Sequence, residues 1–62
     1  MNKARRAQLA KALEIIEQAL GEEEEAFGNL PEALQEAERG ERMAEIIEQL
    51  EEIQGTLQEV IE

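Results

Sequence analysis

Gly28-Asn29-Leu30-Pro31 is the only stretch of this 62-residue chain that combines glycine with proline. Glycine favours the position just after a helix end, and proline favours the first turn of a helix. Asn29 and Glu32 also have the spacing of a helix-capping pair. Leu30 precedes the proline, which biases it away from helical angles. The stretch therefore predicts a break that divides the chain into two helical segments.

Apolar residues before the break recur at helical spacings of three, four and seven positions. They predict a helix over about residues 3–27 whose apolar row packs in a core or dimer seam. Ile15 and several alanines widen one flank of this row. Gly21 and the acidic run 22–25 leave open a kink near residues 21–24. The row consists of Leu9, Leu13, Ile16, Leu20 and Phe27.

A second apolar row follows the break, and its members alternate three and four positions apart. It predicts a helix over about residues 38–61. A turn at 28–31 and a short helical turn at 31–36 are expected to connect the two long helices. Ile47 and Ile61 lie on one flank of the second row. The row consists of Met43, Ile46, Leu50, Ile53, Leu57 and Val60.

Neither a disulfide nor a zinc site can support this short chain, because it contains no Cys and no His. Chains below roughly 70–80 residues usually need such support or a second subunit. A lone pair of helices would also leave half of its wide apolar faces in water. We therefore predict one all-α domain, residues 1–62, that forms an antiparallel helical hairpin and dimerises into a four-helix bundle.

The charges of the two segments favour the antiparallel orientation. A basic block opens the chain, and folding back places it beside C-terminal glutamates, while the acidic run 22–25 meets Arg39 and Arg42. Each exposed pair contributes at most about 1 kcal/mol, but together the pairs select an orientation. One long helix through the turn is the alternative, and Pro31 opposes it. The basic block consists of Lys3, Arg5, Arg6 and Lys11, and the C-terminal glutamates are Glu51, Glu52, Glu59 and Glu62.

The net charge is −10, from sixteen Glu against six Lys plus Arg. This charge disfavours direct binding to nucleic acid or to a negatively charged membrane. It favours a protein partner with a basic surface. No apolar run approaches the ~20 residues of a transmembrane helix, and the basic start is not followed by a secretory apolar stretch. We expect the protein in the cytoplasm.

The residue inventory opposes catalysis, because the chain has no His, Cys, Ser, Asp, Trp or Tyr. Glu14 with Glu17, and Glu45 with Glu48, have a spacing that could serve an all-carboxylate Mg²⁺ site. The same spacing arises readily among sixteen glutamates, and a solvated helix face explains it better. We predict that the protein is not an enzyme and that it has no catalytic, cofactor-binding or metal-binding residues.

A regular row of glutamates follows the second helix on the side opposite to its apolar row. Like charges three and four positions apart oppose helix formation by a few tenths of a kcal/mol each. Such a row can imitate a phosphate backbone, as a DNA mimic does, and occupy a basic groove of a partner protein. The alternative is a face that only keeps the protein soluble. The row consists of Glu41, Glu45, Glu48, Glu52 and Glu59.

Two single residues each allow two interpretations. Glu23 interrupts the first apolar row and is either a buried functional carboxylate or, as we favour, a solvated or Arg-paired residue at the open bundle end. Phe27 is the only aromatic residue. It is either a contact for a partner or, as we favour, a core residue at the turn beside Leu30 and Leu34.

Residues 23–35, Glu-Glu-Glu-Ala-Phe-Gly-Asn-Leu-Pro-Glu-Ala-Leu-Gln, are followed closely by Glu38-Arg39-Gly40-Glu41. This third of the chain resembles small acidic helical proteins of phages, prophages and Gram-positive bacterial genomes. Those proteins carry Phe-x-Asn-Leu-Pro-Glu-x-Leu-Gln before Glu-Arg-Gly and a Glu-rich helix. Ala37 stands where they have Ser, which weakens a helix cap there. The resemblance implies a hairpin and a phage-type origin, with action in the host cytoplasm, but no activity.

Gly40, near the predicted start of the second helix, would allow another backbone segment to approach closely. For the function, we favour a non-enzymatic, phage-type module that dimerises and binds a host protein. Its acidic surface would inhibit a nucleic-acid-handling or defence protein. A purely structural dimerisation or assembly module is the alternative. A metal-dependent helical hydrolase is a third possibility, which the residue inventory opposes.

Overall fold

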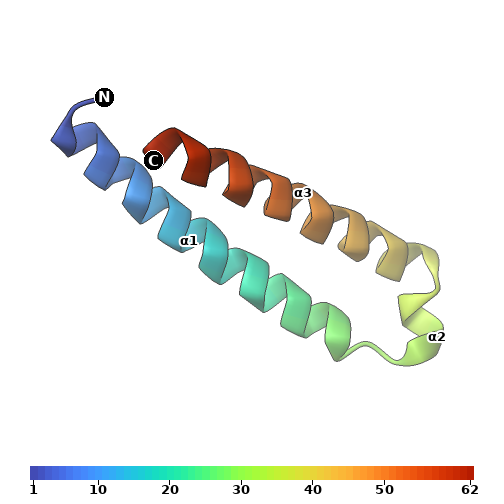
Figure 1. Cartoon of the computed structure of the whole chain (residues 1–62). Coiled ribbons are helices and arrows are strands. Elements are labelled where there is room, and N and C mark those ends of the chain that lie inside the picture. Colours follow the sequence, from blue (N-terminus) through green and yellow to red (C-terminus); the bar gives the residue numbers. More distant parts are fainter.

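The computed structural model covers all 62 residues and is all-helical, with 87% of the chain in helices and no strand. Three helices follow one another: α1 (Lys3–Gly28), α2 (Glu32–Gln35) and α3 (Glu38–Ile61). The two long helices lie side by side and run in opposite directions, with α2 at the corner and both termini at the other end (Figure 1). The hairpin is elongated, with extents of 48 × 15 × 12 Å.

The first helix is continuous along its whole length. Asn2 caps its start, since the Asn2 side-chain oxygen accepts a hydrogen bond from the Arg5 backbone N–H at 2.8 Å. The helix passes through Gly21 and the acidic run 22–25 without interruption. A single glycine costs about 1 kcal/mol in a helix, but in proteins most helical stability comes from tertiary packing, and α1 packs along α3.

The first helix ends without the glycine cap that the sequence suggested. Gly28 is its last residue and not the one after it, and no residue of the chain has a positive φ angle. Instead, the Asn29 backbone N–H donates to the Glu25 carbonyl at 3.0 Å. The proposed capping of α2 by Asn29 toward Glu32 was wrong, because Pro31, in an extended conformation, occupies the capping position.

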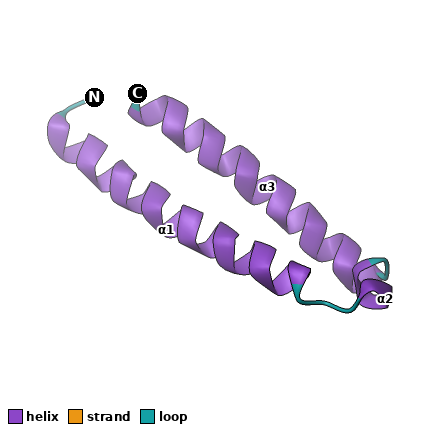
Figure 2. Cartoon of the chain, turned by 60° about the horizontal axis from the view of Figure 1, so that its bottom comes forward, coloured by secondary structure: helices purple, strands orange, loops and turns teal.

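The corner is held by the side chain of Gln35. Its amide nitrogen donates to the carbonyl oxygens of Phe27 at 3.2 Å and of Leu30 at 3.1 Å. These bonds tie α2 to the end of α1 and to the loop between them. Figure 2 shows this loop joining the two helices. Gly40 is buried, and a Cβ at this position would overlap the Gln35 backbone. The close backbone approach predicted for Gly40 is therefore confirmed.

The long helices meet along a narrow seam, and only Leu20 and Gly40 are buried in the hairpin. Seam residues recur four and three positions apart, as in a coiled coil. On α1 the buried or half-buried residues are Leu9, Ala12, Leu13, Ile16, Leu20, Glu23 and Phe27. On α3 they are Gly40, Met43, Ile46, Ile47, Leu50, Gln54, Leu57 and Ile61.

A single polar contact links the side chains of the two long helices. The amide nitrogen of Gln54 donates to the Glu17 carboxylate at 2.9 Å. Because the helices are antiparallel, a residue before Glu17 lies level with the residue that is equally far after Gln54, and the reverse. Leu13 is therefore about level with Leu57, and Phe27 is about level with Met43. None of the four side-chain hydrogen bonds joins a glutamate to a lysine or arginine.

Candidate protein-interaction surfaces

The predicted acidic row lies on the side of α3 that is opposite to its seam with α1, and all five of its carboxylates are exposed. Glu48 and Glu52 each lie two positions from the seam residue Leu50, which is about 200° around the helix. The row therefore faces away from α1 along the outer edge of the hairpin. Carboxylates in this position are free to accept hydrogen bonds from the Lys and Arg side chains of another protein.

The two carboxylate pairs considered as metal ligands do not form a cluster. Glu14, Glu17, Glu45 and Glu48 are all exposed. Glu17 is engaged with Gln54, as described above. No three acidic, His or Cys residues of the chain come close enough together to hold a metal ion.

The row of apolar residues predicted on α3 divides into two sets. Leu50, Leu57 and their half-buried neighbours lie in the seam, whereas Ile53 and Val60 are 49% and 51% exposed. Gln54 and Ile61 take the seam positions beside them. The physical reason is width: the apolar surface of α3 is broader than the strip that one neighbouring helix can cover. All five predicted apolar residues of α1, by contrast, are buried or half-buried.

Beside the seam, each long helix carries a row of residues of similar size: small residues on α1 and large ones on α3. On α1, three alanines follow one another at seven-residue spacing, and they lie four positions before, three after and ten after the seam residue Ile16. On α3, three β-branched residues have the same offsets from the seam residue Leu50. Equal offsets lie on the same side of each helix, and antiparallel neighbours turn that side toward one face of the hairpin. We call this surface the apolar face. Its rows are Ala12, Ala19 and Ala26 on α1, and Ile46, Ile53 and Val60 on α3.

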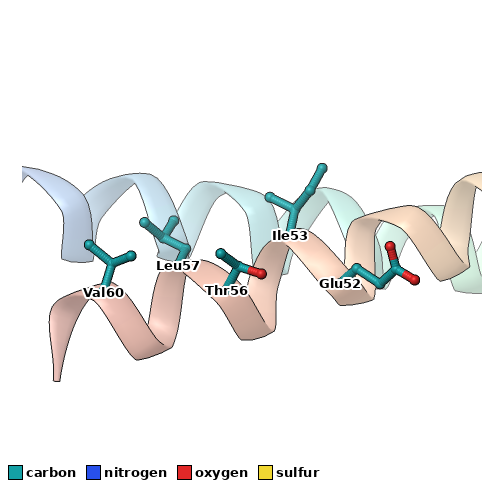
Figure 3. Close-up of a pocket in the computed structure, with 5 residues that line it drawn as sticks. All are labelled: Glu52, Ile53, Thr56, Leu57 and Val60. Carbon is teal, nitrogen blue, oxygen red and sulfur yellow. The ribbon is translucent and has the colours of Figure 1, made fainter.

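On the apolar face, each large residue stands beside a small one. The register set by Glu17 and Gln54 places Ala19 about level with Ile53, and Ala12 about level with Val60. Next to the ridge of large residues is an open depression of about 400 Å³. Figure 3 shows Ile53 and Val60 rising with Leu57 from one side of α3. The depression is lined by Glu52, Ile53, Thr56, Leu57 and Val60.

The remaining predicted residues lie around the corner end. Phe27 and Leu30 are half-buried, whereas Leu34 is 43% exposed. Phe27 thus belongs mainly to the seam. Glu23 is half-buried in the α1 seam row and makes none of the side-chain hydrogen bonds.

Two side chains with structural roles were not predicted from the sequence. Gln35 holds the corner, and Gln54 enters the seam to bond Glu17. Gln54 could have been noticed, because it stands seven positions after Ile47 and seven before Ile61, both apolar. Gln35 gave no such signal, since the chain contains several glutamines with the same type of neighbours.

Comparison with protein-family models, curated proteins and solved structures finds no match for the chain. None of its three helices combines the length and the apolar composition needed to cross a membrane. The function is therefore inferred from the two exposed surfaces, the acidic row and the apolar face.

Proposed function

We propose that this chain is a non-enzymatic, phage-type protein-binding module that dimerises into a four-helix bundle and binds a basic host protein through its acidic row. The main support for the dimer is exposed area. The hairpin exposes 4923 Å². A compact monomer of 7.0 kDa exposes roughly 4,000 Å², so the excess is about 900 Å². A standard interface buries about 800 Å² per partner, so a second copy would remove this excess.

The acidic row supports the second part of the proposal. It lies on the outer edge of α3, and its mean direction is about 100° around the helix from the Ile53–Val60 side. Covering the apolar face therefore leaves four of its carboxylates in water, whereas Glu52 lines the depression at the edge of that face. A dimer would present two such rows, and a chain with net charge −10 attracts a basic partner over a distance of about one Debye length.

The spacing of the row suggests the class of partner. Carboxylates repeated along a rigid helix imitate the phosphates of a nucleic acid, so a basic groove that handles nucleic acid would accept them. We propose that the target is a host nucleic-acid-handling or defence protein, which the module inhibits in the host cytoplasm. The second candidate, a purely structural assembly module, is favoured by the apolar face alone and requires no basic target.

A charge-matched comparison tests the acidic row. Glu41, Glu45, Glu48 and Glu52 are converted to Gln in one variant. In the control variant, Glu14, Glu22, Glu25 and Glu36, which are also exposed, are converted to Gln. Both variants lose four charges and keep their helix-forming residues. Each is immobilised and exposed to a Gram-positive bacterial lysate, and retained proteins are eluted with rising NaCl.

The proposal expects one basic protein to be retained by the parent chain and the control, and to be lost from the acidic-row variant. Its elution should occur at moderate salt, because screening weakens exposed charge pairs. If the acidic-row variant retains the same protein as the parent, the row is only a solvated face. The structural assembly module would then be the better description.

A further inference from the structure

The two hairpins of the proposed bundle can be placed against each other, and the apolar face indicates how. We infer that a second copy covers the apolar face with both corners at the same end of the bundle, so that the Ile/Val row of each copy packs on the alanine row of the other. The inference rests on the proposed dimer and adds its interface and symmetry.

The choice of face follows from what lies on the two sides of the seam. The apolar face carries only alanine and β-branched residues in its two inner rows. On the opposite face, the residues immediately after Ile16 and after Leu50 are Glu17 and Glu51. Two copies joined through that side would bring carboxylates together and remove them from water, which is unfavourable. The apolar face is the one that a like-charged copy can cover.

A closed dimer of two hairpins has a two-fold axis, and two directions of that axis bring the apolar faces together. An axis perpendicular to the helices stacks α3 on α3 and α1 on α1. Large side chains would then meet large ones, while alanines would face alanines. That arrangement would overpack the half of the interface between the two α3 helices and leave a cavity between the two α1 helices. Overpacking and cavities both destabilise a close-packed interior.

An axis parallel to the helices stacks α3 of one copy on α1 of the other. This axis leaves every residue at its own level along the bundle. Ile53 of one copy therefore stays level with Ala19 of the other, and Val60 stays level with Ala12. Each large side chain meets a small one, and every neighbouring pair of helices is antiparallel. The alternation of small and large rows selects this arrangement.

Distances between spin labels distinguish the two axes, and the absence of native cysteine makes single-site labelling clean. A label at Asn29→Cys, in the corner, should give a distance of roughly 15–30 Å in the inferred dimer, because the corners are separated only by the bundle width. The perpendicular axis would separate the corners by about 39 Å, the length of the 26-residue α1. A label at Glu14→Cys, near mid-helix, gives a short distance with either axis and serves as the control.

The results separate the inference from the proposal on which it rests. Short distances from both labels support the inferred arrangement. A short distance at Glu14→Cys with a long one at Asn29→Cys overturns the arrangement and leaves the dimer intact. If neither label reports a partner at micromolar concentration, both the dimer and its inferred symmetry are overturned.

A pair of substitutions tests the face itself. Ala19 and Ala10 are both exposed on α1, but only Ala19 lies on the apolar face. Ala19→Glu should weaken dimerisation at least about a hundredfold in sedimentation equilibrium, since it places a charge in the interface. Ala10→Glu should leave the dimer unchanged. Equal effects of the two substitutions on dimerisation would overturn the choice of face. If Ala19→Glu also lowers helicity, the spin-label distances, which are measured without this substitution, still decide the orientation.

Discussion

The backbone of Gly40 lies directly against the backbone of Gln35, with no space between them for a side chain. The contact joins the first turn of α3 to the last residue of α2. Gln35 at the same time bonds the carbonyls of Phe27 and Leu30. The direction in which α3 leaves the corner is therefore set by two backbone segments in contact and by one amide side chain.

Substitution of this glycine should be costly. Gly40→Ala places a Cβ in the Gln35 backbone, so the corner must open, and we expect a loss of about 1–3 kcal/mol. Gly55→Ala is the control, because a Cβ there meets no atom within 4 Å. Alanine at position 55 should stabilise α3 by about 0.5–1 kcal/mol. Thermal unfolding followed by circular dichroism should move in opposite directions for the two variants.

Removal of the corner amide should also destabilise the hairpin. Gln35→Ala leaves the carbonyls of Phe27 and Leu30 without their side-chain donor, and we expect a loss of about 1–2 kcal/mol. Gln49→Ala is a suitable comparison, because Gln49 is exposed and makes no side-chain hydrogen bond. Urea unfolding that gives equal midpoints for the two variants would show that water replaces the lost bonds.

Leu20 should be the most sensitive apolar position of the single hairpin. It is 6% exposed and is the only large side chain that is buried. Leu20→Ala should cost about 2–3 kcal/mol and lower helicity at 25 °C, since a chain of this size has little stability to lose. Leu34→Ala, at a position that is 43% exposed, should cost under about 1 kcal/mol. The two variants are compared by their far-ultraviolet circular dichroism, which reports helicity, and by the midpoint of thermal unfolding.

Salt should stabilise the protein at neutral pH. Sixteen carboxylates share a small hairpin, and none of its side-chain hydrogen bonds joins an acid to a base. Raising the ionic strength from about 0.01 M to about 1 M shortens the Debye length from ~30 Å to ~3 Å and so screens their repulsion. We expect the melting temperature to rise over this range. A fall would mean that attraction between the helix ends outweighs the repulsion.

The variant with four acidic-row glutamates converted to Gln provides the internal check on this explanation. It has a net charge of −6, from −10 plus the four charges removed. Its melting temperature in low salt should therefore exceed that of the parent, and its response to NaCl should be smaller. An unchanged salt response would assign the effect to charges elsewhere in the chain.

Helical periodicity was enough to predict the all-helical fold and the apolar row of α1. All five predicted members of that row are buried or half-buried, and α1 contacts α3 along its length. The break was also readable, because Pro31 cannot continue a helix formed by the residues before it. Its detailed geometry was not, since Asn29 has the spacing to cap α2 but instead closes the end of α1, and Pro31 takes the capping position of α2.

The division of the α3 apolar surface could not be read from the sequence. Ile53 and Leu57 are equally apolar, and both fit a three–four repeat, yet one is exposed and the other lies in the seam. The outcome depends on how the corner rotates α3 and on the bond between Gln54 and Glu17, both of which are tertiary. All five residues of the acidic row are exposed on α3, but periodicity alone contains no information about what binds them.

The short corner has a consequence for how quickly the chain folds. Of 51 backbone hydrogen bonds, 42 lie within single helices, and the segment that must close to bring α1 and α3 together is only residues 29–37. Topologies with such local contacts fold in microseconds to milliseconds. Each newly made chain should thus collapse into its own hairpin long before it meets another copy. Assembly of the proposed dimer would then be a second-order process, in which the rate is set by protein concentration and not by the folding of each subunit.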